Sequence, residues 1–346
     1  MKIDFSTDQL PTPTTDFEQR VISFVREWFD DSKTVKVQTS GSTGTPKVFD
    51  IEKDRMRYSA NKTCDILGLK QGDSALLCLP VDYISGKMMV VRAIERKLTL
   101  FIKTPSINPL TDLNEAIDFC AMSPLQVENS LDKIHLIKNI IIGGAAVSES
   151  LKSKISDQLN NEKPACRNHI YETYGMSETL SHIALKQIYP IAEDYFKVLE
   201  GVEISLDARC CLQIFAPNLN PEILLTNDLV QINNGIEFRF LGRIDNVINS
   251  AGLKIYPEKL ESLVKKDISN EVVFLGIADE LLGQKLLLII EGQEDADLIQ
   301  QLAKIIYPSK NHQPKDIIFF AKLPRTPNGK IDRRALTQKM IDRLKK

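Results

Sequence analysis

A glycine-, serine- and threonine-rich loop at residues 39–47 has the composition of a phosphate-binding segment. Gly41 and Gly44 permit positive φ and close approach of the backbone, so successive N–H groups can converge on phosphate oxygens. Lys47 adds a positive charge. Hydroxyl donors come from Thr39, Ser40, Ser42, Thr43 and Thr45. A flexible surface turn is the alternative interpretation, because clusters of these residues commonly form plain loops.

A turn-rich stretch at residues 324–329 leads into Lys330, near the other end of the chain. Its prolines stiffen the backbone and its Asn-Gly pair favours a turn, so the lysine is presented at a defined place. A cation placed in this way can neutralise charge on a carboxylate that attacks a phosphate. Unless Lys330 is simply a solvated side chain, the two segments predict a nucleotide held in one part of the chain and acted on from another.

Two further segments carry groups suited to a nucleotide. Glu178 is a hard oxygen ligand of the kind that Mg²⁺ takes alongside phosphate, and Tyr174 offers a flat face for an adenine base. Asp228 ends an apolar strand and could accept hydrogen bonds from ribose hydroxyls, while Arg243 could reach the sugar or the phosphates. Each has an ordinary structural alternative: a common Tyr-Gly turn, a strand-end acid or a surface arginine.

Apolar strands that alternate with amphipathic helices must position these groups. The predicted strands are 35–39, 75–79, 98–102 and 140–142, and the predicted helices are 16–30, 54–67, 86–97 and 148–159. The first strand leads directly into the glycine loop. This alternation is typical of a large layered α/β domain.

The pattern changes after about residue 200. Short alternating segments indicate a small antiparallel or barrel-like β subdomain over 200–244, with strands at 202–206, 212–215, 223–226 and 237–241. A small α+β module is predicted beyond it, with strands at 272–277, 286–290 and 317–320 and helices at 257–266 and 296–306. We place the boundary at Asp245, between an N-terminal domain of residues 1–244 and a mobile C-terminal domain of residues 245–346.

The length of 346 residues allows two domains. The composition argues against several classes of partner. A net charge of −2, from 44 basic and 46 acidic residues, gives no field to attract nucleic acid or an anionic membrane. The longest apolar runs are too short to span a bilayer, and the first residues lack the apolar core of a signal peptide, so a cytoplasmic enzyme is expected. The six cysteines form no CxxC pair, which argues against structural zinc.

Taken in order, the motifs resemble those of the adenylate-forming acyl-CoA synthetases, firefly luciferases and carrier-loading adenylation domains. The matching stretches are Thr39–Lys47, Gly143–Ala145, Tyr174–Glu178, Asp228, Gly242–Asp245, Gly252–Pro257 and Pro324–Arg333. They extend from residue 39 nearly to the C-terminus, so the resemblance covers most of the chain.

The resemblance implies a role for most of the matching stretches. It implies that loop 39–47 holds the β- and γ-phosphates, that Glu178 coordinates Mg²⁺, and that Ser177 lies near the α-phosphate. It also implies that Gly143, Gly144, Ala145 and Tyr174 contact the adenine and the acyl group, and that Asp228 and Arg243 contact the ribose. Asp245 is implied to be the hinge and Lys330 the lysine that acts in adenylation. Gly252 and Lys254 are implied to belong to the loop that acts in thiolation.

The chemistry of the implied reaction explains why such groups are needed. A carboxylate is a poor acyl donor, so it first attacks the α-phosphorus of ATP to give a mixed anhydride and pyrophosphate. Both reactants are anions, and Mg²⁺, Lys330 and the loop N–H groups must offset their repulsion. A thiol then displaces AMP. The lysine has to withdraw for thiol access, which explains its place on a separate module behind a hinge.

Within the family, the chain is most similar to short forms of the o-succinylbenzoate–CoA ligases of menaquinone biosynthesis. The phosphate loop comes early in the chain, and the segment 79–89 with Arg92 is similar to their segment beside the acid pocket. We assign Tyr83, Lys87 and Arg92 to this pocket, with Lys87 or Arg92 pairing with the second carboxylate of the acid. A solvated helix face is the alternative for both cations.

Three positions depart from the family pattern. Asn227 stands where glycine is usual, but asparagine tolerates left-handed backbone geometry. Tyr83 stands where many relatives carry histidine, and Ser177 replaces the commoner threonine while keeping the hydroxyl. The short N-terminal part could leave a more open surface or a different face for a homodimer.

The sequence therefore predicts an enzyme, an AMP-forming acid–thiol ligase that uses ATP, Mg²⁺ and CoA to convert o-succinylbenzoate into its CoA thioester. Three alternatives stay open: another aryl or short acyl acid as substrate, the pantetheine arm of a carrier protein as acceptor, or a non-catalytic nucleotide-binding protein. Glu178 and Lys330 together argue against the last, because a pure binder needs neither.

Overall fold

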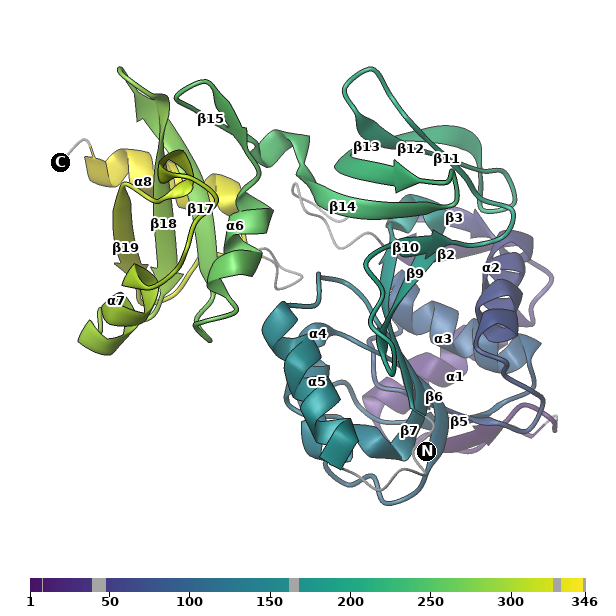
Figure 1. The fold of residues 1–346 in the computed structure, drawn as a ribbon. Coiled ribbons are helices and arrows are strands. Elements are labelled where there is room, and N and C mark those ends of the chain that lie inside the picture. Colours follow the sequence, from purple (N-terminus) through teal and green to yellow (C-terminus); the bar gives the residue numbers. More distant parts are fainter. Residues whose placement is uncertain (8, 39–47, 162–167, 326–330, 345–346) are drawn as a thin grey trace.

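The computed structural model describes residues 1–7, 9–38, 48–161, 168–325 and 331–344 (Figure 1). Its main body is a twelve-stranded mixed sheet with strand order β1-β5-β4-β6-β7-β8-β9-β10-β14-β13-β12-β11. The bounds of the first six strands in this order are β1 Lys2–Asp4, β5 Thr99–Ile102, β4 Ser74–Leu77, β6 Ile117–Met122, β7 Ile137–Ile142 and β8 His169–Gly175.

The strands from β5 to β8 run parallel, and helices cover both of their faces. One face packs against α1 (Asp16–Trp28), α2 (Lys53–Ile66) and α3 (Ile84–Glu95), and the other against α4 (Pro124–Glu128) and α5 (Glu149–Asn161). Alternate residues of a strand enter the two cores. Phe119 joins the first core and Cys120 the second. The layered α/β prediction is confirmed, and each predicted helix and strand of this region is present within a few residues (Figure 1).

The second half of the large sheet is antiparallel. Its strands are β9 His182–Tyr189, β10 Phe196–Val198, β11 Glu203–Leu206, β12 Cys211–Ala216, β13 Asn220–Asn233 and β14 Glu237–Arg243. They enclose a third core around Phe196, Leu212 and Phe238. Of the two forms predicted for this region, the structure has the antiparallel one. Its strands continue the large sheet, because β9 pairs with β8 and β10 joins β9 to β14.

A five-stranded sheet follows the short 3₁₀ turn Ile244–Asn246. Its elements are β15 Ile248–Ser250, β16 Leu253–Ile255, β17 Val272–Asp279, β18 Gly283–Glu291, β19 Asp316–Phe320, α6 Pro257–Val264, α7 Ala296–Ala303 and α8 Arg333–Leu344. Helices α6 and α7 share one core with the sheet, and α8 packs into a second core through Leu336 and Met340 (Figure 1). The predicted α+β character is confirmed.

A separate two-stranded hairpin, β2 (Thr34–Gln38) paired with β3 (Val48–Glu52), flanks the predicted phosphate loop in the sequence. The loop residues, Thr39 to Lys47, lie outside the described residues, as does Lys330. No helix in the described ranges is long and apolar enough to cross a membrane.

Candidate ATP and acid site

The loop after β7 approaches the neighbouring strand β8 closely. Gly143 donates its N–H to the carbonyl of Met122, and Thr173 Oγ1 donates to the carbonyl of Ile142 at 3.1 Å. A Cβ at Gly143 would lie 2.7 Å from Thr173 Oγ1, and Gly144 has φ +86°, so this loop depends on glycine. Gly144 and Ala145 are exposed at the end of the sheet. The structure thus brings the first predicted contact loop to the carboxyl ends of β7 and β8.

Glu172 on β8 anchors this loop, and sequence reasoning missed it. Its buried carboxylate accepts the Val147 N–H at 3.0 Å through Oε1, and its Oε2 forms an ion pair of 2.8 Å with Lys186. A buried acid needs such partners, because an unpaired charge in the interior is costly. The available signal in the sequence is an acid within a strand-like run of residues, directly after Ile170 and Tyr171.

The predicted nucleotide residues Tyr174, Asp228 and Arg243 lie together. Tyr174 donates its phenolic hydrogen to Asp228 Oδ2 at 2.5 Å, and Arg243 Nε lies 3.4 Å from Asp228 Oδ1. Asp228 and Arg243 are Cα partners across β13 and β14, so the sheet register sets this pair. Burial, with the charge of Asp228, raises the pKa of Tyr174, and the phenol therefore stays a hydrogen-bond donor.

The aromatic ring of Tyr174 is packed within the protein. It meets the ring of Phe238 edge-on at a centroid distance of 4.9 Å and lies 5.9 Å from that of Phe196. These contacts fix the side chain at the end of β8, next to the turn that carries Glu178. A contact between Tyr174 and adenine stays a prediction.

The turn between β8 and β9 presents Ser177 and Glu178. Gly175 makes the turn tight, because a Cβ there would lie 2.3 Å from the carbonyl oxygen of Ser181. Thr179 Oγ1 accepts the Met176 N–H at 3.1 Å and closes the 3₁₀ turn Ser177–Thr179. Glu178 is exposed at this turn.

Glu178 fits a magnesium ion that is also held by phosphate. None of the described residues forms a group of three or more metal-binding side chains, so a site made by protein ligands alone is absent from the described ranges. Mg²⁺ usually takes one or two carboxylates together with substrate phosphates and water. An exposed single carboxylate at the strand ends meets that requirement.

The two predicted pocket cations are both buried, so the solvated helix face is wrong for each of them. Lys87 lies over the ring of Phe24 at 4.0 Å from the centroid and 3.9 Å from Glu27, so it is engaged with α1. Arg92 instead reaches the β8–β9 turn, where its Nη2 donates to Ser181 Oγ at 2.6 Å. Tyr83 is 37% exposed and precedes α3.

The predicted hinge lies at a polar junction between the two sheets. Asp245 accepts from Asn227 Nδ2 at 3.0 Å and lies 3.4 Å from Arg243 Nη2. Glu258 at the start of α6 accepts from Asn246 Nδ2 at 2.6 Å, which joins the C-terminal sheet to this turn. Gly252, with φ +77°, and Lys254 are exposed in the β15–β16 hairpin.

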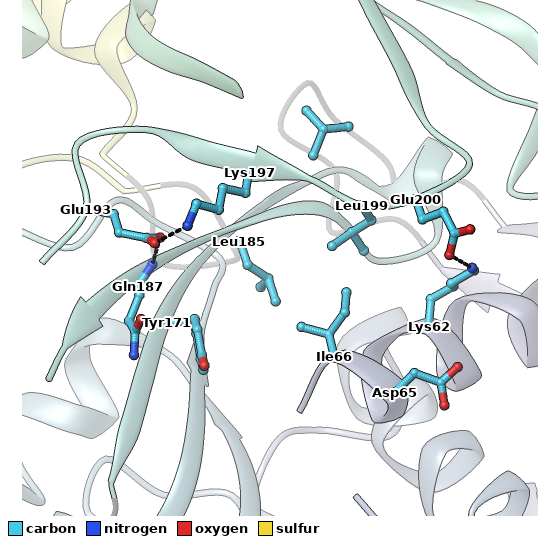
Figure 2. A pocket seen from close by; sticks show the side chains of 11 residues that line it. Lys62, Asp65, Ile66, Tyr171, Leu185, Gln187, Glu193, Lys197, Leu199 and Glu200 are labelled. Carbon is cyan, nitrogen blue, oxygen red and sulfur yellow. Dashed lines mark hydrogen bonds and ion pairs between the residues drawn. The ribbon is translucent and has the colours of Figure 1, made fainter. Parts of the chain in front are cut away.

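A pocket of about 450 Å³ lies apart from these residues, between α2 and the strands β8 to β10 (Figure 2). Its apolar wall includes Ile66, Leu185 and Leu199. Its charged side chains are already paired, Lys62 with Glu200 at 2.6 Å and Lys197 with Glu193. None of the predicted site residues lines this pocket, so the predicted ATP and acid site does not coincide with it.

Comparison with known proteins identifies the family. A family model described as AMP-binding enzyme matches residues 37–201. The crystal structure of an acyl-CoA synthetase (AMP-forming)/AMP-acid ligase II-like protein from Dyadobacter fermentans is 33% identical, covers 98% of this chain and 99% of its own, and has a TM-score of 0.66. The O-succinylbenzoate coenzyme A synthetase of Bacillus subtilis, solved with ATP and a magnesium ion, shares the fold, with 20% identity and a TM-score of 0.71 over 87% of this chain and 69% of its own.

A curated relative extends the match. The 2-succinylbenzoate–CoA ligase of Lactococcus lactis is 26% identical over 97% of this chain and 80% of its own length. The family resemblance drawn from the motifs is confirmed. With 33% identity to a synthetase-like protein over nearly its whole length, this chain belongs to the AMP-binding enzymes, the family of the AMP-forming acyl-CoA synthetases and acid ligases.

Proposed function

We propose that this AMP-forming acid–CoA ligase acts on o-succinylbenzoate. One carboxylate of the acid attacks the α-phosphorus of ATP, which forms an acyl-adenylate and releases pyrophosphate. The thiol of CoA then attacks the acyl carbon, which releases AMP and gives o-succinylbenzoyl-CoA. The observation that carries the substrate assignment is Arg92, a buried guanidinium with no carboxylate partner among the described residues.

Arg92 has the properties of a group that receives an anion. Only 2% of its surface is exposed, and its Nε has no hydrogen-bond partner in the described part of the chain. Burial lowers the pKa of Arg92 to about 10, so the group stays charged at neutral pH. A buried, unpaired cation is strongly unfavourable. The second carboxylate of o-succinylbenzoate would supply the missing partner and would orient the acid at the same time.

Lys87 is less suited to this task. Its ammonium group already lies over the Phe24 ring and near Glu27 on α1, and reaching a ligand would break both contacts. Of the two cations that the sequence offered, we therefore assign the second carboxylate to Arg92. Tyr83, directly before the same helix, is exposed, and its place in the pocket stays a prediction.

Groups at the ends of β7, β8 and β14, together with Asp228 within β13, support ATP binding. Asp228 and Arg243 offer a carboxylate and a guanidinium for the ribose, and Tyr174 holds Asp228 in place. Glu178, with Ser177 beside it, would hold a magnesium ion, which neutralises phosphate charge when it is bound. Gly143 and Gly144 bring the end of β7 close to the same edge. We assign phosphate binding to loop 39–47.

The second half-reaction needs access for a thiol. We assign the hinge to Asp245, in the turn between the sheets, and the thiolation loop to Gly252 and Lys254, which are exposed beyond it. Lys330 would enter the site for adenylation and leave it for thiolysis. The protein would then use one arrangement of the active site for adenylation and another for thiolysis. A homodimer and a cytoplasmic location stay predictions.

Pyrophosphate release tests the proposal across a panel of carboxylic acids. The panel contains o-succinylbenzoate, its two monocarboxylate analogues, benzoate and short aliphatic acids, each with and without CoA. We expect ATP- and Mg²⁺-dependent release to be greatest with o-succinylbenzoate, and the mass of the CoA product to match its thioester. A greater rate with another acid would replace the substrate. Thioester formation on a carrier protein but not on CoA would replace the acceptor, and no release with any acid would favour a non-catalytic binder.

A further inference from the structure

A chain of buried and partly buried hydrogen bonds begins at Arg92 and ends in helix α2. Arg92 Nη2 donates to Ser181 Oγ at 2.6 Å, and Ser181 Oγ lies 3.2 Å from His182 Nδ1. His182 Nε2 lies 3.2 Å from Thr63 Oγ1, which donates to the carbonyl of Ser59 at 3.1 Å. Three elements contribute, α3, the start of β9 and α2. His182 is 6% and Thr63 1% exposed. The sequence motifs assign no role to these two residues.

The direction of every bond follows from the last acceptor. The carbonyl of Ser59 can only accept, so the hydroxyl hydrogen of Thr63 is committed to it. Thr63 Oγ1 must therefore accept from His182, which places the imidazole hydrogen on Nε2. Burial, and then the positive charge of Arg92, lower the pKa of His182 to about 3, so the ring is neutral and Nδ1 is an acceptor. Ser181 then donates to Nδ1 and keeps a lone pair for Arg92.

We propose that Ser181 and His182 are positioning residues that hold the Arg92 guanidinium in the orientation that receives the second carboxylate of the acid. This inference rests on the proposed function, because it explains how that function's selectivity is set. Neither residue touches the reacting atoms in this account. Both act through Arg92.

The physical reason is that a guanidinium is a planar group with five N–H donors, and a buried one can turn about its side-chain bonds. Ser181 fixes one corner of the plane at Nη2. Nη1 meets only the weak acceptor Met89 Sδ, at 3.8 Å, and Nε has no partner in the described part of the chain. Because Nη2 is held by Ser181, the N–H groups of Nη1 and Nε stay in one position, where a carboxylate can accept hydrogen bonds from them.

Substrate preference is the quantity that separates this role from a merely structural one. We define the preference as the ratio of kcat/KM for o-succinylbenzoate to that for the monocarboxylate analogue that is turned over, 4-oxo-4-phenylbutanoate or 2-butanoylbenzoate. His182→Leu removes the acceptor at similar volume, and Ser181→Ala removes the link. We expect each to lower the preference about tenfold through KM, with kcat within about twofold, as for loss of one hydrogen bond to a charged group.

Matched variants control for general damage. His182→Asn keeps an oxygen acceptor near the position of Nδ1 and should keep the preference within about threefold. Gln187→Leu removes a different side-chain hydrogen bond from the same strand, to His169, and should leave the preference unchanged. In an Arg92→Ala background, His182→Leu should have no further effect on the preference, because the two residues act as one unit.

Spectra of the unaltered protein provide a test that needs no variant to fold. With ¹⁵N-labelled histidine, His182 should appear as the neutral Nε2–H tautomer between pH 5 and pH 8. An Nδ1–H tautomer, or a charged ring in that range, would overturn the inference.

The same measurements distinguish a failure of the proposed function from a failure of the positioning role of Ser181 and His182. If Arg92→Ala abolishes the preference while Ser181→Ala and His182→Leu leave it within about twofold, the function stands and the positioning role is wrong. An equal loss from His182→Leu with and without Arg92 would also contradict it. If the unaltered enzyme shows no preference for the dicarboxylate, the proposed function fails, and the inference fails with it.

Discussion

The phenolic hydroxyl of Tyr174 lies 2.5 Å from Oδ2 of Asp228 and donates a hydrogen bond to it. The two residues are 54 positions apart in the sequence and come from strands β8 and β13. This bond ties the turn that carries Glu178 to the acid that we assign to the ribose. Asp228 also keeps its other oxygen toward Arg243, at 3.4 Å. The metal side and the sugar side of the proposed ATP site are therefore one connected unit.

Tyr174→Phe tests this connection. The variant keeps the ring contacts with Phe196 and Phe238 and removes only the hydrogen bond to Asp228. We expect the KM for ATP to rise about threefold to tenfold, since a hydrogen bond to a charged group contributes about 1.5–3 kcal/mol and part of this is regained from water. Titration with ATP in a pyrophosphate-release assay measures the change. Tyr171→Phe, on the same strand, is the control, and equal effects from both variants would contradict the assignment.

Gly175→Ala tests the tight turn between β8 and β9. The new Cβ would lie 2.3 Å from the Ser181 oxygen and 2.5 Å from the His182 Cα, and neither backbone group can move independently. We expect a destabilisation of about 3 kcal/mol, at the upper end of the usual range for overpacking, and loss of adenylation because Ser177 and Glu178 are displaced. Denaturant unfolding and pyrophosphate release measure the two effects.

Gly235→Ala is the matched control for that variant. Gly235 has φ +74° but no atom within 4 Å of a built Cβ, so it carries conformational strain without a clash. We expect a loss of about 1 kcal/mol in the free energy of unfolding and unchanged activity. A Gly175→Ala protein as stable and active as Gly235→Ala would show that the turn tolerates a side chain.

His182 should make the stability of the protein depend on pH. Burial and the charge of Arg92 lower its folded pKa from the ordinary 6.5 to about 3. Between these values the unfolded chain binds a proton that the folded protein does not, so stability rises with pH. The contribution of neutral His182 to the free energy of unfolding is therefore fully present above about pH 6.5 and is lost as the pH falls toward 3.

The His182→Asn variant isolates this effect. We expect the stability difference between the natural protein and the variant to shrink by about 1.4 kcal/mol for each pH unit well below 6. Urea unfolding at pH 7.5, 6.0 and 5.0 measures it. A constant difference across these values would mean that His182 titrates in the folded protein much as it does in the unfolded chain.

Lys330→Ala should separate the two half-reactions. We expect formation of the acyl-adenylate to fall by about 10²-fold or more, because a cation that stabilises developing charge is lost. Thiolysis of pre-made acyl-adenylate by CoA should stay within a few-fold, since we propose that the lysine is withdrawn at that step. Lys322→Ala, which removes an exposed lysine of the same module, is the control. Undiminished adenylation in Lys330→Ala would overturn the role given to the lysine.

Much of the fold could be predicted from local pattern. The helices at 16–30 and 54–67 and the strands at 75–79 and 140–142 follow apolar periodicity, and the structure has them as α1, α2, β4 and β7. The way β9 and β10 join the parallel and antiparallel strands into one sheet could not be predicted, because pairing between distant strands leaves little trace in one sequence.

The site was predictable where residue type carries the chemistry and less so where packing decides. The side chains of Tyr174, Asp228 and Arg243 predict nucleotide contacts, and the structure brings the three residues together. Lys87 and Arg92 could not be separated by sequence, because the difference lies in what each one contacts. Thr63 and His182, 119 positions apart, had no shared pattern that would reveal their contact.

Direct detection of the adenylate tests whether this protein activates o-succinylbenzoate. The protein is mixed with o-succinylbenzoate, ATP and Mg²⁺ without CoA, and the products are identified by mass. We expect o-succinylbenzoyl-AMP with one equivalent of pyrophosphate, and its conversion to the CoA thioester and AMP once CoA is added. Pyrophosphate and an adenylate formed with a different acid, but none with o-succinylbenzoate, would contradict the account.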